Sequence, residues 1–275
     1  MKNKELRWRK IEKSALSVSR LNIITLFDPS PDPFLTAQFT LPAKAILEYV
    51  ASEKQKTGKA VTVTYAVMKM LSAAMLMHKE FNSVVLDRDV YELKDINVTV
   101  PFLIPGTDKE LTNLIFENPQ KMTLAQIEDK GRAMMKAQQS ADAHASRLKK
   151  RFLPLLIIKT RLYKLIPEKI LYRIVHERGL GSNIVLTNAS HRGKARLFIT
   201  KSATQIMRNF TRFYLHGVEE RPVVKDGEIV AEKQLTISVA FDHRLIDGIH
   251  LNEFLETLEQ LSLDPAKMDE APVEN

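Results

Sequence analysis

The chain has 275 residues, of which 44% are hydrophobic, and it carries a net charge of +8. A chain of this size can bury a sizeable core, arranged as one or two domains. It contains no cysteine, which excludes a disulfide framework, a cysteine nucleophile and a thiolate metal site, and which fits a reducing cytoplasm. The charged start MKNKELRWRKIEK has no apolar run behind it, so no secretory signal is expected. No stretch reaches the roughly 18 apolar residues of a membrane span.

The predicted elements alternate between strands and helices. In chain order we expect an irregular or short helical arm over 1–20, a strand over 35–41, a helix over 42–54, a helix within 61–81, a hairpin and a strand over 83–105, and a long helix from Thr123. The second half adds a strand in NIVLTNAS (183–190), a hairpin turned at Asp226-Gly227 and a final helix over 249–261. No repeat or linker-like stretch divides the chain, so the pattern predicts one mixed α/β domain.

The positive charge is concentrated in one segment. Residues 147–178 contain ten Lys/Arg against two acidic residues, which accounts for the net charge of +8. Prolines 154 and 167 are expected to break the segment into short helices with one apolar and one cationic face. Two interpretations stay open. The first is a solvated helix pair on the surface. The second is an amphipathic patch around Lys149, Lys150 and Arg151 that meets anionic lipid, a phosphorylated cofactor or an acidic carrier protein.

Familiar catalytic and cofactor motifs are absent from the sequence. It contains no G-x-G-x-x-G after a strand, no Walker loop, no H-E-x-x-H and no G-x-S-x-G, and its seven histidines have no metal-ligand spacing. We therefore expect no metal. His243 and His250 could share a helix face, but His250 has no evident partner and is interpreted as structural.

A polar cluster, AFDHRLIDGIH (240–250), lies between an alternating apolar segment and an amphipathic helix. One interpretation is a helix N-terminus capped by Asp242 or Asp247, with His243 in solvent. The other is a catalytic site in which His243 acts as a general base. Asp247 would then support the loop, and Gly248 would supply a backbone conformation closed to other residues. Spacing alone favours the first interpretation.

The octet FDHRLIDG (241–248) resembles the D-H-R-x-x-D-G signature of the catalytic domain of 2-oxo acid dehydrogenase acyltransferases. The related chloramphenicol acetyltransferases carry H-H-x-x-x-D-G at this place. The segments VTVTYAVMKMLSAA, DINVTVP, GVEERPVVKDGEIV and FLETLEQL follow the same order, so the resemblance covers roughly Leu16 to Leu261. It implies a chloramphenicol acetyltransferase-like α/β fold, a mixed sheet flanked by helices. On this basis we expect an N-terminal arm (1–20), a catalytic domain (21–265) with a basic insertion (147–180), and an acidic tail (266–275).

The resemblance implies roles for the residues of the octet. His243 matches the histidine that removes the proton from the attacking thiol. Asp247 matches the carboxylate that holds the loop by pairing with an arginine, which Arg20 would supply here. Asp242, Arg244 and Gly248 complete the supporting set.

The resemblance also implies a hydroxyl donor. The segment IVLTNAS (184–190) matches the family's F-T-I-S-N-L-G strand, which places Thr187 at the serine that steadies the tetrahedral oxyanion, with Asn188 next to it. Threonine keeps the hydroxyl but adds a methyl group, and Ser190 replaces a glycine. These departures put the geometry or the acceptor size in question.

The function implied is that of a stand-alone acyltransferase. It would move an acyl group between a coenzyme A thioester and a thiol such as dihydrolipoamide, or another acceptor, by direct transfer, with the lipoyl group supplied in trans by a partner. A homotrimer is implied, with each active site between subunits, in the cytoplasm or at an anionic membrane surface, and with no nucleic acid. Two alternatives stay open: an O- or N-acyltransferase acting on a small molecule or lipid, and a catalytically silent scaffold or membrane-peripheral binding module.

Overall fold

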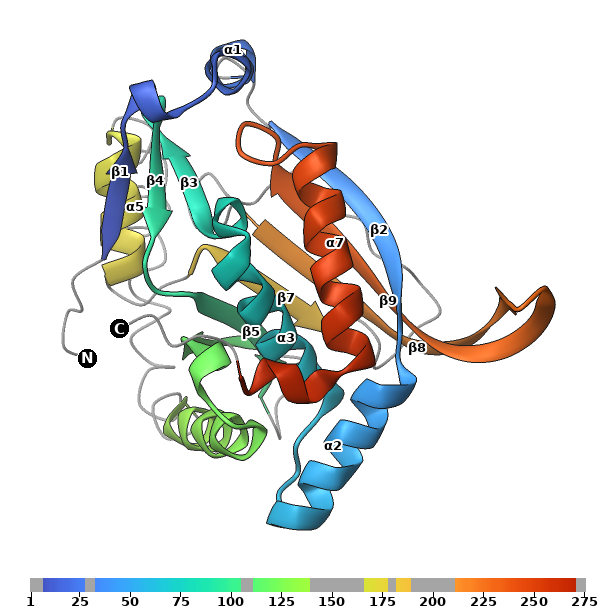
Figure 1. The fold of residues 1–275 in the computed structure, drawn as a ribbon. Helices are drawn as coiled ribbons and strands as arrows, with labels where there is room; N and C mark the ends of the chain where they lie inside the picture. The colour runs from blue at the N-terminus through green and yellow to red at the C-terminus, as the bar shows by residue number, and fades with distance from the viewer. Residues whose placement is uncertain are drawn as a thin grey trace.

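The computed structural model describes residues 7–27, 33–104, 111–138, 166–177, 182–188 and 211–270. Two sheets organise these residues (Figure 1). The six-stranded sheet is ordered β2 (Phe34–Pro42), β9 (Glu228–Asp242), β8 (Thr211–Lys225), β7 (Ile184–Asn188), β5 (Asn97–Leu103) and β6 (Leu111–Glu117). The three-stranded sheet is ordered β1 (Trp8–Ile11), β4 (Asp89–Leu93) and β3 (Ser83–Leu86).

The large sheet is mixed. Strand β7 pairs in parallel with both β5 and β8, whereas β2–β9, β8–β9 and β5–β6 pair antiparallel. The register places Thr187 beside Tyr214 and Tyr214 beside Ser238. The expected mixed sheet flanked by helices is thus confirmed.

Helices cover one face of the large sheet, where α3 (Val63–Met77) and α7 (Gly248–Leu263) pack together (Figure 1). The alternation along β9 explains this arrangement, because Leu235, Ile237, Val239 and Phe241 point into the core that α3 and α7 close. The intervening positions face the other side of the sheet and include polar residues such as Ser238. The sheet therefore has an apolar face under the helices and a polar face opposite.

The other described helices have the following bounds. They are α1 (Val18–Phe27), α2 (Lys44–Thr57), α5 (Glu168–Glu177), a helical stretch over 124–138, and the short 3₁₀ turns η1 (Lys13–Ala15), η2 (Lys79–Asn82), η3 (Pro119–Lys121) and η5 (Pro265–Met268). Helix α2 ends at Gly58, whose φ of 66° is the left-handed conformation that glycine adopts at helix ends. None of the described helices is long and apolar enough to cross a bilayer.

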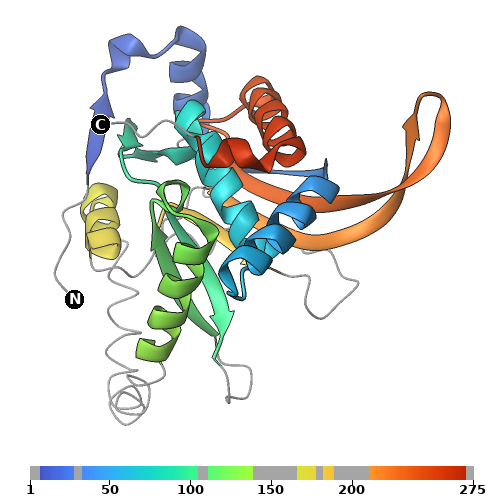
Figure 2. The ribbon, with the colours of Figure 1, turned by 60° about the horizontal axis from the view of Figure 1, so that its bottom comes forward.

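The ends of β8 and β9 form a ribbon that projects away from the body of the molecule in both views (Figures 1 and 2). Its turn lies at Asp226-Gly227, as the sequence predicts, and both residues have positive φ, 53° and 85°. Two left-handed residues in a tight turn match the twist of the two strands. Near the tip, Val224 and Ile229 are 73% and 77% exposed.

The small sheet holds the end of the basic segment. Helix α5 begins directly after Pro167, as expected, and buries Tyr172, whose ring stacks on Trp8 of β1 at 5.8 Å. Lys169 lies 4.9 Å from the centre of the Tyr91 ring, a cation–π contact. This part of the segment is thus packed against the protein, while Lys149, Lys150 and Arg151 lie outside the described residues.

The N-terminal arm differs from the expectation. Instead of an irregular or short helical arm, Trp8–Ile11 forms a strand that pairs antiparallel with β4. Its partner residues, Val90 to Leu93, are about eighty positions away in the sequence, so local periodicity cannot reveal the pairing.

Candidate active site

His243 lies in the turn between β9 and α7, where the backbone holds it from two sides. Its amide donates to the carbonyl of Pro33 at 2.9 Å, and its ring Nδ1 lies 3.0 Å from the carbonyl oxygen of Ile246. A carbonyl oxygen only accepts hydrogen bonds, so Nδ1 must carry the proton. In the neutral ring the lone pair is then on Nε2, which is the nitrogen able to accept a proton.

Asp247 anchors the other end of the same turn. It is the N-cap of α7, and its Oδ1 accepts from the amides of Ile249 and His250 at 3.1 and 3.4 Å. Its Oδ2 accepts from Arg20 Nη2 at 2.8 Å, which is the ion pair that the resemblance implies. Arg20 also donates to the carbonyl of Arg244 at 3.3 Å, so α1 is attached to the turn at two points. Asp247 therefore caps helix α7 and also holds the loop, so both interpretations apply to it.

The contact between His250 and Asp247 was not predicted from the sequence, which left His250 without an evident partner. Its Nδ1 lies 2.7 Å from Asp247 Oδ1 across the first turn of α7, so it is a partner of this carboxylate. The spacing of three residues on a helix is the signal that could have revealed the contact.

The environment keeps Asp247 ionised. Partial burial raises the pKa of its carboxyl. Hydrogen bonds from the His250 side chain and backbone, together with the charges of His250 and Arg20, outweigh this effect and bring the pKa below its ordinary value of 3.8. Because the pKa of Asp247 is lower in the folded state than in the unfolded state, its ionised carboxylate stabilises the fold at pH values above the unfolded-state pKa. This stabilisation is lost as the pH falls through the folded-state pKa. At neutral pH the carboxylate holds Arg20.

We expect Arg20 and Asp247 to be energetically coupled. Arg20→Ala and Asp247→Ala should each lower the free energy of unfolding, because each leaves a partly buried charge without its partner. A double-mutant cycle in urea should give a coupling energy of about 0.5–3 kcal/mol.

The matched control is the ion pair Lys10–Asp89, whose charged atoms lie 2.9 Å apart. Its cation is 42% exposed, against 12% for Arg20, so the coupling should be smaller. Additive effects of the Arg20 and Asp247 substitutions would contradict the coupling. Since Asp247→Asn removes the titrating group, it should also flatten the loss of stability below about pH 4.

Asp242 and Arg244 form a second, more deeply buried pair. Asp242 has an exposed fraction of 0%, and its carboxylate accepts from the Arg244 backbone amide at 2.9 Å and from Nε and Nη2 of the same guanidinium at 3.0 and 2.6 Å. A fork-shaped guanidinium that meets both carboxylate oxygens fixes the local geometry. This pair thus fixes the chain directly before and after His243.

Gly248 does not have the role expected of it. Gly248 is the first residue of α7, and its φ is not positive. A Cβ added at this position would meet no atom within 4 Å. The expectation of a backbone conformation closed to other residues is therefore wrong. Side-chain contacts of Asp247 close the turn instead.

Thr187 and Asn188 lie at the end of β7. The neighbours Ile184 and Leu186 point into the core under the helices, so the half-buried Thr187 faces the opposite, polar side of the sheet. Asn188 points the other way and donates from Nδ2 to Thr64 Oγ1 at 2.7 Å, which attaches the strand to the first turn of α3.

One chain does not bring Thr187 and His243 together. Thr187 is in register with Ser238 across β8, and Asp242, next to His243, lies further along β9. Two strand spacings and four residues along the strand put Thr187 and Asp242 roughly 16 Å apart. This is too far for both side chains to contact one reacting carbonyl. Among the described residues, no group of three or more His, Asp or Glu is placed to hold a metal ion.

A family model described as 2-oxoacid dehydrogenases acyltransferase (catalytic domain) matches residues 211–269. This stretch contains β8, β9, the turn with His243 and Asp247, and α7. The resemblance to this acyltransferase family is confirmed. Arg20, Thr187 and Asn188 lie outside the matched stretch.

Similar curated proteins match over the same short length. The dihydrolipoyllysine-residue succinyltransferase component of the 2-oxoglutarate dehydrogenase complex from Saccharomyces cerevisiae is 46% identical over 54 residues, which is 20% of this chain and 12% of that protein. The dihydrolipoyllysine-residue acetyltransferase component of the Bacillus subtilis pyruvate dehydrogenase complex is 44% identical over 48 residues, 18% of this chain and 11% of that protein. The matched stretch thus spans about an eighth of the relatives' length.

Solved structures share the fold over nearly the whole chain. A probable dihydrolipoamide acetyltransferase from Listeria monocytogenes has a TM-score of 0.61 at 13% identity and covers 96% of both chains. The dihydrolipoamide acetyltransferase of Azotobacter vinelandii has a TM-score of 0.60 at 17% identity over 91% of this chain and 88% of that one. A chloramphenicol acetyltransferase has a TM-score of 0.57 at 15% identity over 92% and 98%. The chloramphenicol acetyltransferase-like fold is thereby confirmed.

Proposed function

We propose that this protein is an acyltransferase that moves an acyl group between coenzyme A and a thiol of the dihydrolipoyl kind, with His243 as general base. The observation that carries the proposal is the hydrogen bond between His243 Nδ1 and the carbonyl of Ile246. It selects the tautomer whose Nε2 accepts a proton, in a turn secured by Arg20 and Asp247. The relatives' names supply the substrate class, since they act on dihydrolipoyllysine residues.

The chemistry needs a base for one substrate and a hydrogen-bond donor for the other. A thiol has a pKa of about 8.5, so at neutral pH a base at the thiol increases the reactive thiolate. His243 Nε2 takes the thiol proton as sulfur attacks the thioester carbonyl. The carbonyl oxygen becomes an oxyanion, which a hydroxyl such as that of Thr187 stabilises until the second thiolate leaves with the proton from His243.

The separation of Thr187 from His243 favours a site built by two copies of the chain. In a homotrimer, His243 of one subunit would face Thr187 of its neighbour, and the polar sheet face around Thr187 would lie at the contact. Coenzyme A and the lipoyl group of another protein would then enter between subunits. This proposal accounts for the separation of Thr187 and His243 within one chain.

The proposed reaction is tested directly by incubating the purified protein with acetyl-CoA or succinyl-CoA and dihydrolipoamide. Release of coenzyme A should depend on the acceptor, and the intact mass of the acceptor should increase by one acyl group. Small alcohols and amines in place of dihydrolipoamide test the O- and N-acyltransferase alternative. Hydrolysis without transfer would contradict the proposal. No turnover with any acceptor would also contradict it and would favour the silent scaffold.

For Thr187 we expect the hydroxyl to matter more than the shape of the side chain. Thr187→Val keeps the shape but removes the donor, so kcat should fall by about 10²–10³. Thr187→Ser keeps the donor and serves as the matched control, with kcat close to that of the native protein. Steady-state rates with saturating acyl-CoA measure both variants, and equal rates for Val and Thr would assign this position to packing alone.

A further inference from the structure

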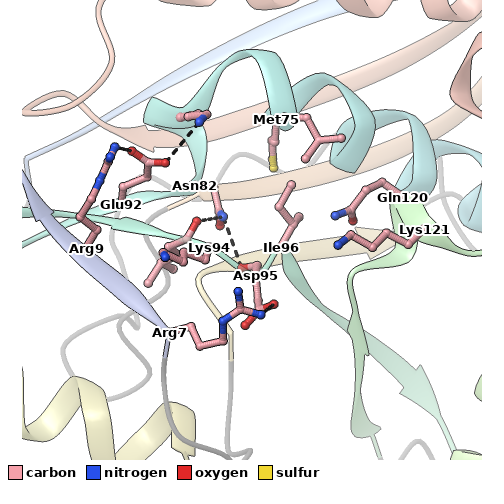
Figure 3. A pocket seen from close by; sticks show the side chains of 13 residues that line it. Arg7, Arg9, Met75, Asn82, Glu92, Lys94, Asp95, Ile96, Gln120 and Lys121 are labelled. Atoms are coloured by element: carbon pink, nitrogen blue, oxygen red, sulfur yellow. Dashed lines mark hydrogen bonds and ion pairs between the residues drawn. The ribbon is translucent and has the colours of Figure 1, made fainter. Parts of the chain in front are cut away.

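A cavity of about 450 Å³ opens between the small sheet and the end of α3, and shares no residue with the candidate active site (Figure 3). Its apolar residues are Met75, Leu76, Leu93 and Ile96. All of these except Leu76 are buried. The volume lies within the range of about 300–1,000 Å³ that small-molecule sites occupy.

The rim of this cavity carries more positive than negative charge. It is lined by Arg7, Arg9, Lys79, Lys94 and Lys121 and by two carboxylates, Glu92 and Asp95. Glu92 is shared by Arg9 at 2.6 Å and Lys79 at 3.5 Å, and Asp95 lies 3.5 Å from Arg7. The two carboxylates therefore already serve three of the cations.

Lys94 and Lys121 supply the excess charge. In the described part of the chain neither amino group forms an ion pair, and both side chains are exposed at the rim. In Figure 3 the ends of Lys121 and Gln120 point from one side toward Ile96. Cations gathered in a concave site with an apolar floor raise the local concentration of anions.

Two buried amides, those of Asn82 and Gln120, lie in the wall of the cavity. Asn82 is 3% exposed and donates from Nδ2 to the carbonyls of Leu93 and Asp95 at 2.9 and 3.3 Å, which fixes the orientation of its amide. Within the described residues, its Oδ1 and the Oε1 of Gln120, which is 7% exposed, accept no hydrogen bond. Buried amide oxygens without a donor are uncommon. Both oxygens are shielded from solvent, so the two amides shape the wall of the cavity and are not contacts for a ligand.

We propose that this cavity binds a small oxyanion, a phosphate or a carboxylate, with Lys94 and Lys121 as its principal cationic contacts. Arg7 and Lys79 line the same cavity and add to its positive charge. The site is separate from the acyl-transfer chemistry, so its test does not depend on turnover.

The experiment titrates the purified full chain with sodium phosphate, glycerol 3-phosphate and citrate, with sodium chloride replaced to hold the ionic strength constant. Isothermal calorimetry reads binding, and the midpoint of thermal unfolding gives an independent measure, because a ligand of the folded state raises it. We expect saturable binding of at least one oxyanion. A preference for the two phosphates assigns the site to phosphorylated molecules, and a preference for citrate assigns it to carboxylates.

The variants locate the site. Lys94→Gln/Lys121→Gln should weaken the preferred anion by about tenfold or more, since both exposed lysines can be replaced without opening the core. The matched control, Lys44→Gln/Lys54→Gln on the exposed face of α2, makes the same change of net charge and should leave the affinity unchanged. Absence of saturable binding by every anion, or an equal loss in both double variants, would overturn the proposal.

Discussion

If the proposed function is correct, we expect His243→Ala to remove nearly all transfer of acyl groups from coenzyme A to dihydrolipoamide and to leave the fold intact. General base catalysis contributes typically 10²–10⁴-fold, and a fall of this size in kcat/KM is expected. The fold should be retained because the protein holds position 243 through its backbone amide, which donates to the carbonyl of Pro33 at 2.9 Å. The measurement is the initial rate of coenzyme A release together with the thermal unfolding midpoint.

His243→Asn is the matched variant for the geometry of the turn. Its side-chain amide can still donate to the carbonyl of Ile246, as Nδ1 of the histidine does, but it cannot take a proton at neutral pH. Both variants should therefore be equally slow, while His243→Asn preserves more of the stability. A rate for either variant close to that of the native protein would make His243 a structural residue and remove the basis of the proposed mechanism.

Arg244→Ala should lower the free energy of unfolding by about 3–5 kcal/mol, because it leaves the carboxylate of Asp242 buried without its cation. Asp242 has an exposed fraction of 0%, and the guanidinium of Arg244 contacts both of its oxygens. Arg244→Lys should recover only part of the loss, since an ammonium cannot reproduce the two-pronged contact. Urea unfolding measures both variants.

A control and a double variant test the cause of this loss. Arg221→Ala, in the ribbon, removes an arginine whose partner Glu219 lies two residues away on the same strand, and should change stability by no more than about 0.5 kcal/mol. Asp242→Leu/Arg244→Met removes both charges, and should destabilise less than Arg244→Ala alone. A double variant that is less stable than Arg244→Ala would mean that packing of the guanidinium, and not the stranded charge, sets the loss.

The sequence predicts the helices, strands and turns of the site better than it predicts which of them pair and which side chains meet. The strand in NIVLTNAS, the hairpin turn at Asp226-Gly227 and the final helix depend on local signals, namely alternation, turn residues and helical periodicity, and each is found as expected. The strand β1 was missed because its partner is distant in the chain. The contact of His250 with Asp247 was missed because a side chain's direction depends on how the helix begins.

By itself, the sequence determined that this is a mixed α/β protein without a cysteine nucleophile of its own, with a histidine turn between a strand and a helix, and with a resemblance to acyltransferases carried by FDHRLIDG. Only the tertiary structure decided which charges meet there. Arg20 and Asp247 are more than two hundred positions apart, and their 2.8 Å contact exists because α1 reaches the β9–α7 turn. It also decided that Gly248 is an ordinary first residue of a helix and that Thr187 lies far from His243 in the same chain. The physical reason is that periodicity reports the face on which a residue lies, whereas distances across a sheet follow from strand order and register, which depend on contacts between distant segments.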